Sequence, residues 1–132
     1  MRNLYILLFS CLPILACSQG KDNLKDKFAD YFLIGATINQ EDYQIIDKDE
    51  KVLKIVSENF NSLTPENSMK WMHSHPEYSK FTFSNAQKIT DFAKENDMYL
   101  LGHTLVWHNQ IPEYISEIGD KNKFDLHLKN HI

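Results

Sequence analysis

The chain has 132 residues, of which 42% are hydrophobic and 24% are charged, and its formal net charge at pH 7 is −4. This length supports one modest hydrophobic core, so the sequence forms one domain or part of one. The mildly acidic balance gives no sign of the basic surface that binds nucleic acid, and we expect no nucleic-acid partner.

The first twenty residues have the pattern of an export signal. Arg2 precedes an almost wholly apolar run over residues 4–16, which is shorter than the ~20 residues of a comfortable membrane span. The run ends in Ile14-Leu15-Ala16-Cys17, and a small residue before a cysteine resembles the cleavage box of bacterial lipoproteins. We therefore expect a signal peptide over residues 1–17, with cleavage before Cys17 and lipid on that cysteine. The alternative is ordinary secretion after cleavage nearby.

The two cysteines, Cys11 and Cys17, both belong to this N-terminal segment. The sequence after residue 17 contains no cysteine, and therefore no disulfide framework and no thiol nucleophile. We expect residues 18–23 to form a tether and residues 24–132 to form the domain. The protein is then expected to be exported and held at the bacterial cell envelope or surface only by the lipid at Cys17, or otherwise to be secreted.

The first half of the expected domain contains two helical and two strand patterns. Apolar side chains on one helical face begin it, namely Leu24, Phe28, Tyr31 and Phe32. A short buried strand is predicted over residues 32–36. Asp47 and Glu50 have the spacing of a capping box and predict the start of a helix of about ten residues. A second strand is predicted over residues 60–64.

The second half repeats this order. Ser84 and Gln87 have the same capping-box spacing and predict a helix that ends near Asn96. Its inward-facing apolar stripe is expected to consist of Ala86, Ile89, Phe92 and Ala93. A third strand is predicted over residues 98–104. After a connecting segment, Asp120 is expected to cap a final helix.

This alternation of helices and strands predicts an α/β fold with parallel strands and crossover helices. A doubly wound sheet would normally carry a glycine-rich first turn, and Ile34-Gly35-Ala36-Thr37 lacks the GxGxxG pattern. We therefore expect a (β/α)8 TIM barrel. Such a barrel needs roughly 250 residues, so this chain is expected to be truncated to about the first three βα units.

Polar side chains follow the second predicted strand, where an α/β barrel places its functional groups. Glu66, Asn67 and Lys70 are spaced so that all three point the same way if the turn is helical. A carboxylate, an amide and an ammonium offer directed hydrogen bonds, and the group carries no single net charge. This combination suits a neutral polyhydroxyl ligand better than a phosphate. The alternative is an exposed ion pair between Glu66 and Lys70.

A second group of polar and aromatic residues ends the third predicted strand. Trp107 offers a flat apolar face that can stack on a sugar ring. His103 and Gln110 offer hydrogen bonds to hydroxyl groups. The alternative is that His103 is buried and bonded to the backbone, with Trp107 in the core.

The histidines do not predict a metal site. His103 and His108 point to opposite faces of an extended strand. His73 and His75 could face the same way in an extended loop, but no third ligand is evident.

Two long motifs and several shorter matches run through residues 24–132 in a fixed order. The matching residues are Phe32-x-x-Gly35-Ala36, Asn59-Phe60-Asn61, Thr64-x-Glu66-Asn67-x-Met69-Lys70-Trp71, Phe81-x-Phe83, Phe92-Ala93 and Gly102-His103-Thr104-Leu105-Val106-Trp107-His108-x-Gln110-x-Pro112. Together they resemble glycoside hydrolase family 10. The resemblance implies a retaining endo-β-1,4-xylanase on a (β/α)8 barrel, with xylan or xylo-oligosaccharides as its substrate and without a cofactor.

The family's substrate-binding roles carry over position by position. The six matching positions are Glu66, Asn67, Lys70, His103, Trp107 and Gln110. The first three correspond to residues that bind the glycone sugars just upstream of the scissile bond. The next two surround the sugar that is cleaved, and the last is a further glycone-binding amide.

Three departures from the family pattern lie outside these six positions. Met72 stands where the family commonly has an acid, and residues 78–80 lack a usual glycine. Tyr114 stands where a tryptophan is frequent. These differences bear on loop shape and specificity rather than on the family.

The catalytic carboxyl groups are expected elsewhere. Retaining glycosidases use two carboxyl groups ~5–5.5 Å apart. The resemblance places both on glutamates, one after the fourth strand and one at the seventh, and residues 129–132 resemble the helix before the fourth strand. We therefore expect both beyond Ile132 and no xylanase activity from these residues alone. The alternatives are a non-catalytic xylan-binding remnant of such an enzyme, and an α/β domain in which the motifs are structural.

Overall fold

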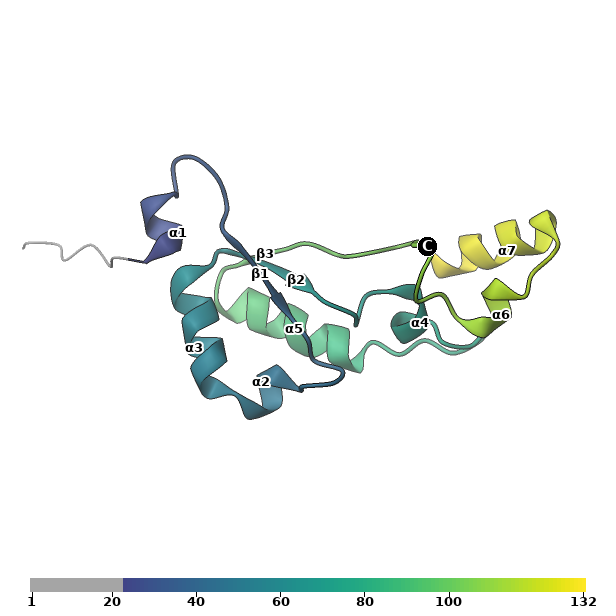
Figure 1. The fold of residues 1–132 in the computed structure, drawn as a ribbon, viewed down its shortest axis with the longest axis horizontal. Coiled ribbons are helices and arrows are strands. Elements are labelled where there is room, and N and C mark those ends of the chain that lie inside the picture. The colour runs from purple at the N-terminus through teal and green to yellow at the C-terminus, as the bar shows by residue number, and fades with distance from the viewer. Residues whose placement is uncertain (1–22) are drawn as a thin grey trace, which may run out of the picture.

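The computed structural model describes residues 23–132. The expected signal peptide, the lipidation site Cys17 and the tether up to residue 22 lie outside the described residues. Within residues 23–132, no helix is both long enough and apolar enough to cross a bilayer. Short strands alternate with helices, and the long axis of the molecule runs from the sheet region to the C-terminal helix (Figure 1).

Three parallel strands form one sheet in the order β1–β2–β3. The strands are β1 (Gly35–Ile38), β2 (Ser62–Pro65) and β3 (Tyr99–Leu100). The register pairs Ala36 with Leu63, and Leu63 with Leu100. The predicted α/β order is confirmed. The strand limits were wrong, because β1 and β2 begin later than expected and β3 ends at Leu100.

Two local features explain these limits. The N–H groups of Asn61 and Ser62 both donate to the carbonyl of Ile34, at 3.0 and 3.1 Å, so the regular ladder begins only at the pair Gly35 and Ser62. At the other end, Leu101 N–H donates to the carbonyl of Leu63 at 2.9 Å. The next ladder bond would need an N–H at Pro65, which proline lacks.

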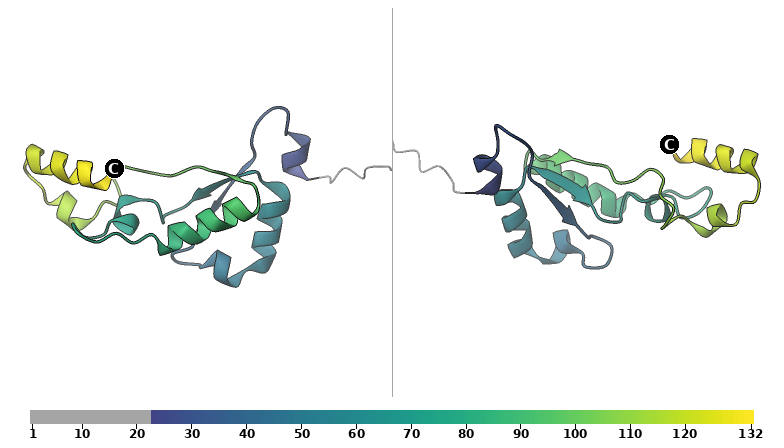
Figure 2. Two further views of the ribbon diagram at one scale, coloured as in Figure 1. Left: turned by 180° about the vertical axis from the view of Figure 1, so that it is seen from behind. Right: turned by 45° about the horizontal axis from the view of Figure 1, so that its top comes forward.

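The crossover helices α3 (Glu50–Asn59) and α5 (Ser84–Glu95) pack with the sheet around one hydrophobic core (Figures 1 and 2). The buried core side chains are Ile38, Val56, Leu63, Ile89, Ala93 and Met98. Burial of an aliphatic side chain of this size stabilises the fold by about 1.5–3 kcal/mol. The inward-facing stripe predicted for α5 is therefore confirmed.

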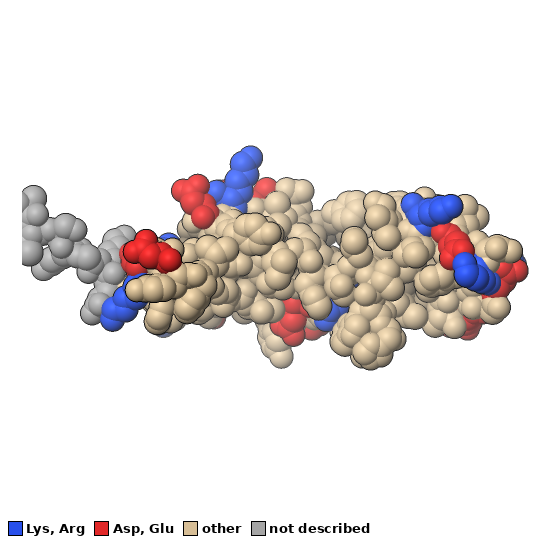
Figure 3. Space-filling view, turned by 90° about the horizontal axis from the view of Figure 1, so that it is seen from above, with Lys and Arg blue, Asp and Glu red and all other residues tan. Residues whose placement is uncertain are grey.

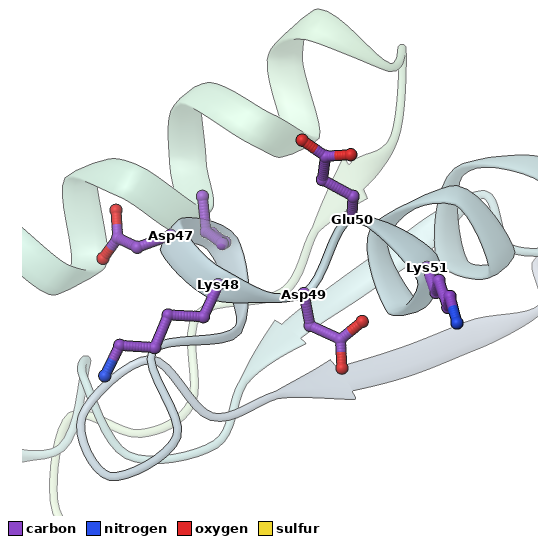
Figure 4. A pocket seen from close by; sticks show the side chains of 6 residues that line it. Asp47, Lys48, Asp49, Glu50 and Lys51 are labelled. Atoms are coloured by element: carbon purple, nitrogen blue, oxygen red, sulfur yellow. The ribbon is translucent and has the colours of Figure 1, made fainter.

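The predicted capping box of α3 was wrong. Asp49, not Asp47, precedes the helix, and its Oδ1 accepts a hydrogen bond from Val52 N–H at 3.0 Å. Asp47 lies in the short helix α2 (Ile45–Lys48), where its carboxylate accepts from Lys88 Nζ at 2.6 Å. Figure 4 shows the Asp47 and Asp49 carboxylates pointing in different directions. The Lys88 ammonium lowers the pKa of Asp47 below its ordinary value, and the Gln40 amide does so to a lesser extent.

The other two predicted caps had opposite outcomes. Phe83 occupies the N-cap position of α5, which has no side-chain cap, so the prediction for Ser84 was wrong. Asp120 caps α7 (Lys121–His131), as predicted, and accepts from the N–H groups of Asn122 and Lys123 at 2.7 and 3.1 Å.

The amphipathic helix predicted at the start of the domain is shorter than expected. Helix α1 spans Leu24–Lys27 and is capped by Asn23. Phe28 and Phe32 stack at 5.1 Å between ring centroids, yet both are exposed. Within the described residues this apolar face has no core to pack against, so its periodicity does not extend the helix.

Two further short helices lie in segments where no helix was predicted. They are α4 (Trp71–Ser74) and α6 (Glu113–Ser116). Together with α7 they form the end of the molecule opposite α3 (Figure 1). In the view of Figure 3, most of the surface between the charged groups at the two ends carries no charge. The apolar side chains Leu101, Leu105 and Val106, on the segment that follows β3, are exposed.

Candidate functional site

A hollow of about 330 Å³ lies where β1 and β2 end. Its lining residues are Thr37, Thr64, Pro65, Glu66, Lys70 and His103. The C-terminal ends of parallel strands meet at one edge of a sheet, and this edge is where α/β folds place their sites. Three of the six predicted substrate-binding residues therefore surround one space.

Lys70 and Asn67 form the best-ordered part of this site. Both side chains are 8% exposed, and Lys70 Nζ donates to Asn67 Oδ1 at 2.9 Å. The same turn is closed by a backbone bond from Lys70 N–H to the Asn67 carbonyl at 2.8 Å. A buried ammonium is costly without partners, so this bond holds the charge at the edge of the hollow.

Glu66 lies beside this pair and is exposed. Among residues 23–132 it forms no ion pair with Lys70, whose ammonium is turned to Asn67 instead. The alternative of an exposed Glu66–Lys70 ion pair is therefore not what the described chain forms.

Trp107 reaches the same ammonium from the loop that follows β3. Lys70 Nζ lies 4.9 Å from the centroid of the Trp107 ring, within the range of a cation–π interaction. The Trp107 side chain is 36% exposed, so it is not a core residue. His103 is also exposed, and it lines the hollow rather than being buried against the backbone. The peptide bond between His103 and Thr104 is cis.

Gln110 is the predicted residue with the least direct connection to the hollow. It does not line the hollow, and its backbone has a left-handed φ of 51°. Its carbonyl accepts a hydrogen bond from Met72 N–H at 3.0 Å, which ties the loop after β3 to α4. Its side-chain Oε1 is buried without a hydrogen-bond partner among the described residues.

His73 and His75 do not belong to a metal site among the described residues. His75 is fully buried and stacks on Phe81 with 4.0 Å between ring centroids. Its Nε2 lies 3.0 Å from the carbonyl oxygen of Tyr78. Across residues 23–132, no group of three or more histidine, cysteine, aspartate and glutamate side chains is arranged to hold a metal ion.

Thr37 and Thr64 line the hollow but were missed from the sequence. They are register partners in adjacent strands, so their side chains lie next to each other. The first strand was predicted to end at Ala36, which placed Thr37 beyond the sheet edge. The available signal was the threonine near the end of each of two parallel strands.

A family model described as "Glycosyl hydrolase family 10" matches residues 23–132. The chain is 44% identical over 131 residues to a protein of Dictyoglomus thermophilum named "Beta-1,4-xylanase", covering 98% of this chain and 35% of that protein. It is 43% identical over 115 residues to "Endo-1,4-beta-xylanase A" of Caldicellulosiruptor saccharolyticus, covering 83% and 32%. The chain thus spans about a third of the length of the curated relatives it matches.

Solved structures give the same result. Xylanase 10B from Thermotoga petrophila in complex with xylobiose matches with a TM-score of 0.74 at 36% identity, covering 83% of this chain and 34% of that one. Native xylanase 10B from Thermotoga maritima also matches at 0.74, with 38% identity and the same coverage. This likeness implies a (β/α)8 barrel, of which the described residues form a part with a three-stranded parallel sheet.

Proposed function

The chain belongs to glycosyl hydrolase family 10, and we propose that its protein is an endo-1,4-β-xylanase. In this proposal the protein hydrolyses β-1,4-xylosidic bonds of xylan with retention of configuration. The support is the xylanase names of its relatives and the polar, aromatic-edged hollow at the C-terminal ends of β1 and β2.

The observation that carries this proposal is the contact of Lys70 with both Asn67 and Trp107 beside the hollow. An ammonium has three N–H donors, and Asn67 takes one, which leaves donors for sugar hydroxyl groups. Glu66 supplies acceptor oxygens, and the exposed part of the Trp107 ring supplies an apolar face for a pyranose ring. A neutral polyhydroxyl ligand fits this combination.

We propose that the six predicted residues bind the substrate and do not cleave it. Retaining hydrolysis needs two carboxyl groups ~5–5.5 Å apart. Among the residues that line the hollow, only Glu66 carries a carboxyl group. The two catalytic glutamates would then come from residues beyond Ile132.

Residues 1–132 alone are predicted to release no reducing ends from xylan. The experiment compares this polypeptide with the protein expressed from its complete open reading frame. Turnover is expected only from the complete protein, with the β-anomer as the first product by NMR. Turnover by residues 1–132 above a boiled control would contradict the assignment of roles. Xylan binding without turnover by the complete protein would instead favour the non-catalytic remnant.

Lys70→Met in the complete protein is predicted to raise KM for xylo-oligosaccharides. Loss of a hydrogen bond from a charged donor costs about 1.5–3 kcal/mol, or roughly 10–100-fold in affinity. Lys80→Met is the matched control, because Lys80 is exposed and, within residues 23–132, its ammonium pairs only with Glu77 at 2.7 Å. Equal kinetics for the two variants would remove Lys70 from the binding site.

The proposal also includes export and a lipid anchor on Cys17. Its support is the charged start, the apolar run and the small residue before the cysteine. Metabolic labelling with a radioactive fatty acid tests it. The label should be incorporated by the wild-type protein and lost in Cys17→Ser, and an unlabelled wild type would contradict the anchor.

A further inference from the structure

Both loops that carry the predicted sugar-binding residues are fastened to the short helix α4. The loop after β2 leads directly into it, because Lys70 is its N-cap residue. The loop after β3 is attached through the bond from Met72 N–H to the Gln110 carbonyl. A second attachment lies four residues further along, at Tyr114 in α6.

The Tyr114 hydroxyl makes two hydrogen bonds at this attachment. It accepts from Trp71 Nε1–H at 3.0 Å and donates to the carbonyl oxygen of His75 at 3.2 Å. Trp71 is 1% exposed and His75 is fully buried, so water does not replace these bonds. One hydroxyl thus bridges the two ends of α4.

The neighbours of Trp71 show why this bridge matters for the site. Its indole ring lies flat against the His131 ring, with 4.2 Å between centroids and an interplanar angle of 1°. The stack restrains the face of the indole, and the hydrogen bond to the Tyr114 hydroxyl fixes the position of its N–H edge. The next residue toward the N-terminus is Lys70, whose ammonium contacts Asn67 and Trp107.

We propose that Tyr114 is a positioning residue that fixes the loops after β2 and β3 relative to each other, so that Lys70, Trp107 and Gln110 bind the same sugar chain. This inference rests on the proposed function. Among residues 23–132, the Tyr114 hydroxyl bonds to Trp71 and His75, and neither lines the hollow. Tyr114 therefore acts through Trp71 and through its own loop.

Replacing Tyr114 with phenylalanine separates positioning from packing. The ring and its contacts with His75 and His127 remain. The buried Trp71 N–H, however, loses its acceptor, and the two loops lose one of their ties. Tyr78→Phe is the matched control, since Tyr78 is half-exposed and, within residues 23–132, only its ring and its backbone carbonyl make contacts.

The test uses the protein expressed from its complete open reading frame and a series of xylo-oligosaccharides. Tyr114→Phe is expected to raise KM about 10-fold and to change kcat less than about twofold, because the affected contacts hold substrate and transition state alike. Tyr78→Phe should match the wild type. A Tyr114→Phe variant that matches Tyr78→Phe, or one that loses kcat at constant KM, would overturn the proposal.

A second variant distinguishes loss of this hydrogen bond from a general loss of stability. Trp71→Phe breaks the same hydrogen bond from its other side, and the double variant Trp71→Phe/Tyr114→Phe leaves no orphaned donor. If the bond acts as proposed, the increases in KM are not additive and the double variant resembles Trp71→Phe. Additive increases, or recovery of KM in the double variant, would show a role in packing alone.

A readout without substrate distinguishes this inference from the proposed function. The indole N–H of Trp71 should exchange with deuterium about 10-fold faster in Tyr114→Phe than in Tyr78→Phe, as expected for loss of ~1.4 kcal/mol of protection. Equal exchange overturns the positioning role. A wild-type protein that does not cleave xylan overturns the proposed function, whereas an active wild type with an unaffected Tyr114→Phe variant overturns this inference alone.

Discussion

The two ends of the molecule are held together by different chemistry. The sheet end buries aliphatic side chains such as Ile38, Leu63 and Ile89 between β-strands and helices. The other end, formed by α4, α6 and α7, contains stacked rings and hydrogen bonds, with Trp71 and His75 at its centre. The hollow lies between these two ends. The sheet end supplies a rigid strand edge, and the end formed by α4, α6 and α7 positions the polar side chains.

This contrast explains which parts of the molecule a sequence pattern can predict. Aliphatic burial repeats with the period of a helix or a strand, so it leaves a signal in every core element. Ring stacking and single hydrogen bonds join residues far apart in sequence, and they follow no period. Substitutions at the two ends should therefore differ in both size and pH dependence.

The largest effect is expected in the aliphatic core. Leu63→Ala removes a side chain with no exposure at the centre of the sheet and should lower the free energy of unfolding by about 3 kcal/mol. Ile55→Ala is the control, because Ile55 lies on α3 and is 56% exposed among residues 23–132. Urea denaturation of the complete protein measures both. Equal urea midpoints for the two variants would show that the sheet end does not stabilise the fold as described.

A smaller effect is expected at the start of α3. Asp49→Ala removes the side-chain cap on Val52 N–H and should cost about 1 kcal/mol. Lys88→Met removes an exposed ion pair with Asp47, leaves the Gln40 amide bonded to the Asp47 carboxylate, and should cost less. Thermal unfolding at low and high salt separates the two, because only the contribution of the Asp47–Lys88 ion pair should be screened. An Asp49→Ala variant as stable as the wild type would contradict the cap at Asp49.

The smallest effect concerns His131 at the ring-rich end. Burial lowers its pKa in the folded protein, and the nearby His75 acts in the same direction. The unfolded chain keeps the ordinary pKa of about 6.5 and binds the proton more readily. Stability is therefore complete above about pH 6.5 and falls as the pH drops through the folded pKa. The effect is modest, since the side chain is partly exposed.

Melting temperatures at pH 7.5 and pH 5.5 measure this effect. His131→Phe keeps an aromatic ring against Trp71 and should reduce the loss of stability between the two pH values. His108→Phe, at an exposed position, should leave that loss unchanged. A pH dependence that is the same in all three proteins would exclude His131 as a source.

The sequence predicted the βα order, the core stripe of α5 and the cap at Asp120, because each depends on neighbours within a few residues. It failed at Asp47, where two acids of suitable spacing compete for one helix start. Lys88, which lies 41 residues away in sequence, binds the Asp47 carboxylate, and Asp49 caps the helix instead. Local spacing could not show that this partner would take the carboxylate.

The candidate site follows the same division. The close approach of Lys70 to Asn67 was predicted from their spacing along a turn. The contact of Lys70 with Trp107, and the bond from Trp71 to Tyr114, join separate loops and required the fold. Sequence alone therefore identified Glu66, Lys70 and His103 at the hollow. It missed Thr37 and Thr64, and it missed the contacts that position the polar side chains.

The loops after β2 and β3 are proposed to bind xylose units together. Titration of the complete protein with xylotriose, followed through the indole N–H resonance of Trp107, tests it most directly. We predict a saturable shift with xylotriose, its weakening by Lys70→Met, and no shift with the α-linked glucose trimer maltotriose. An unchanged Trp107 resonance in a protein that still cleaves xylan would contradict the account.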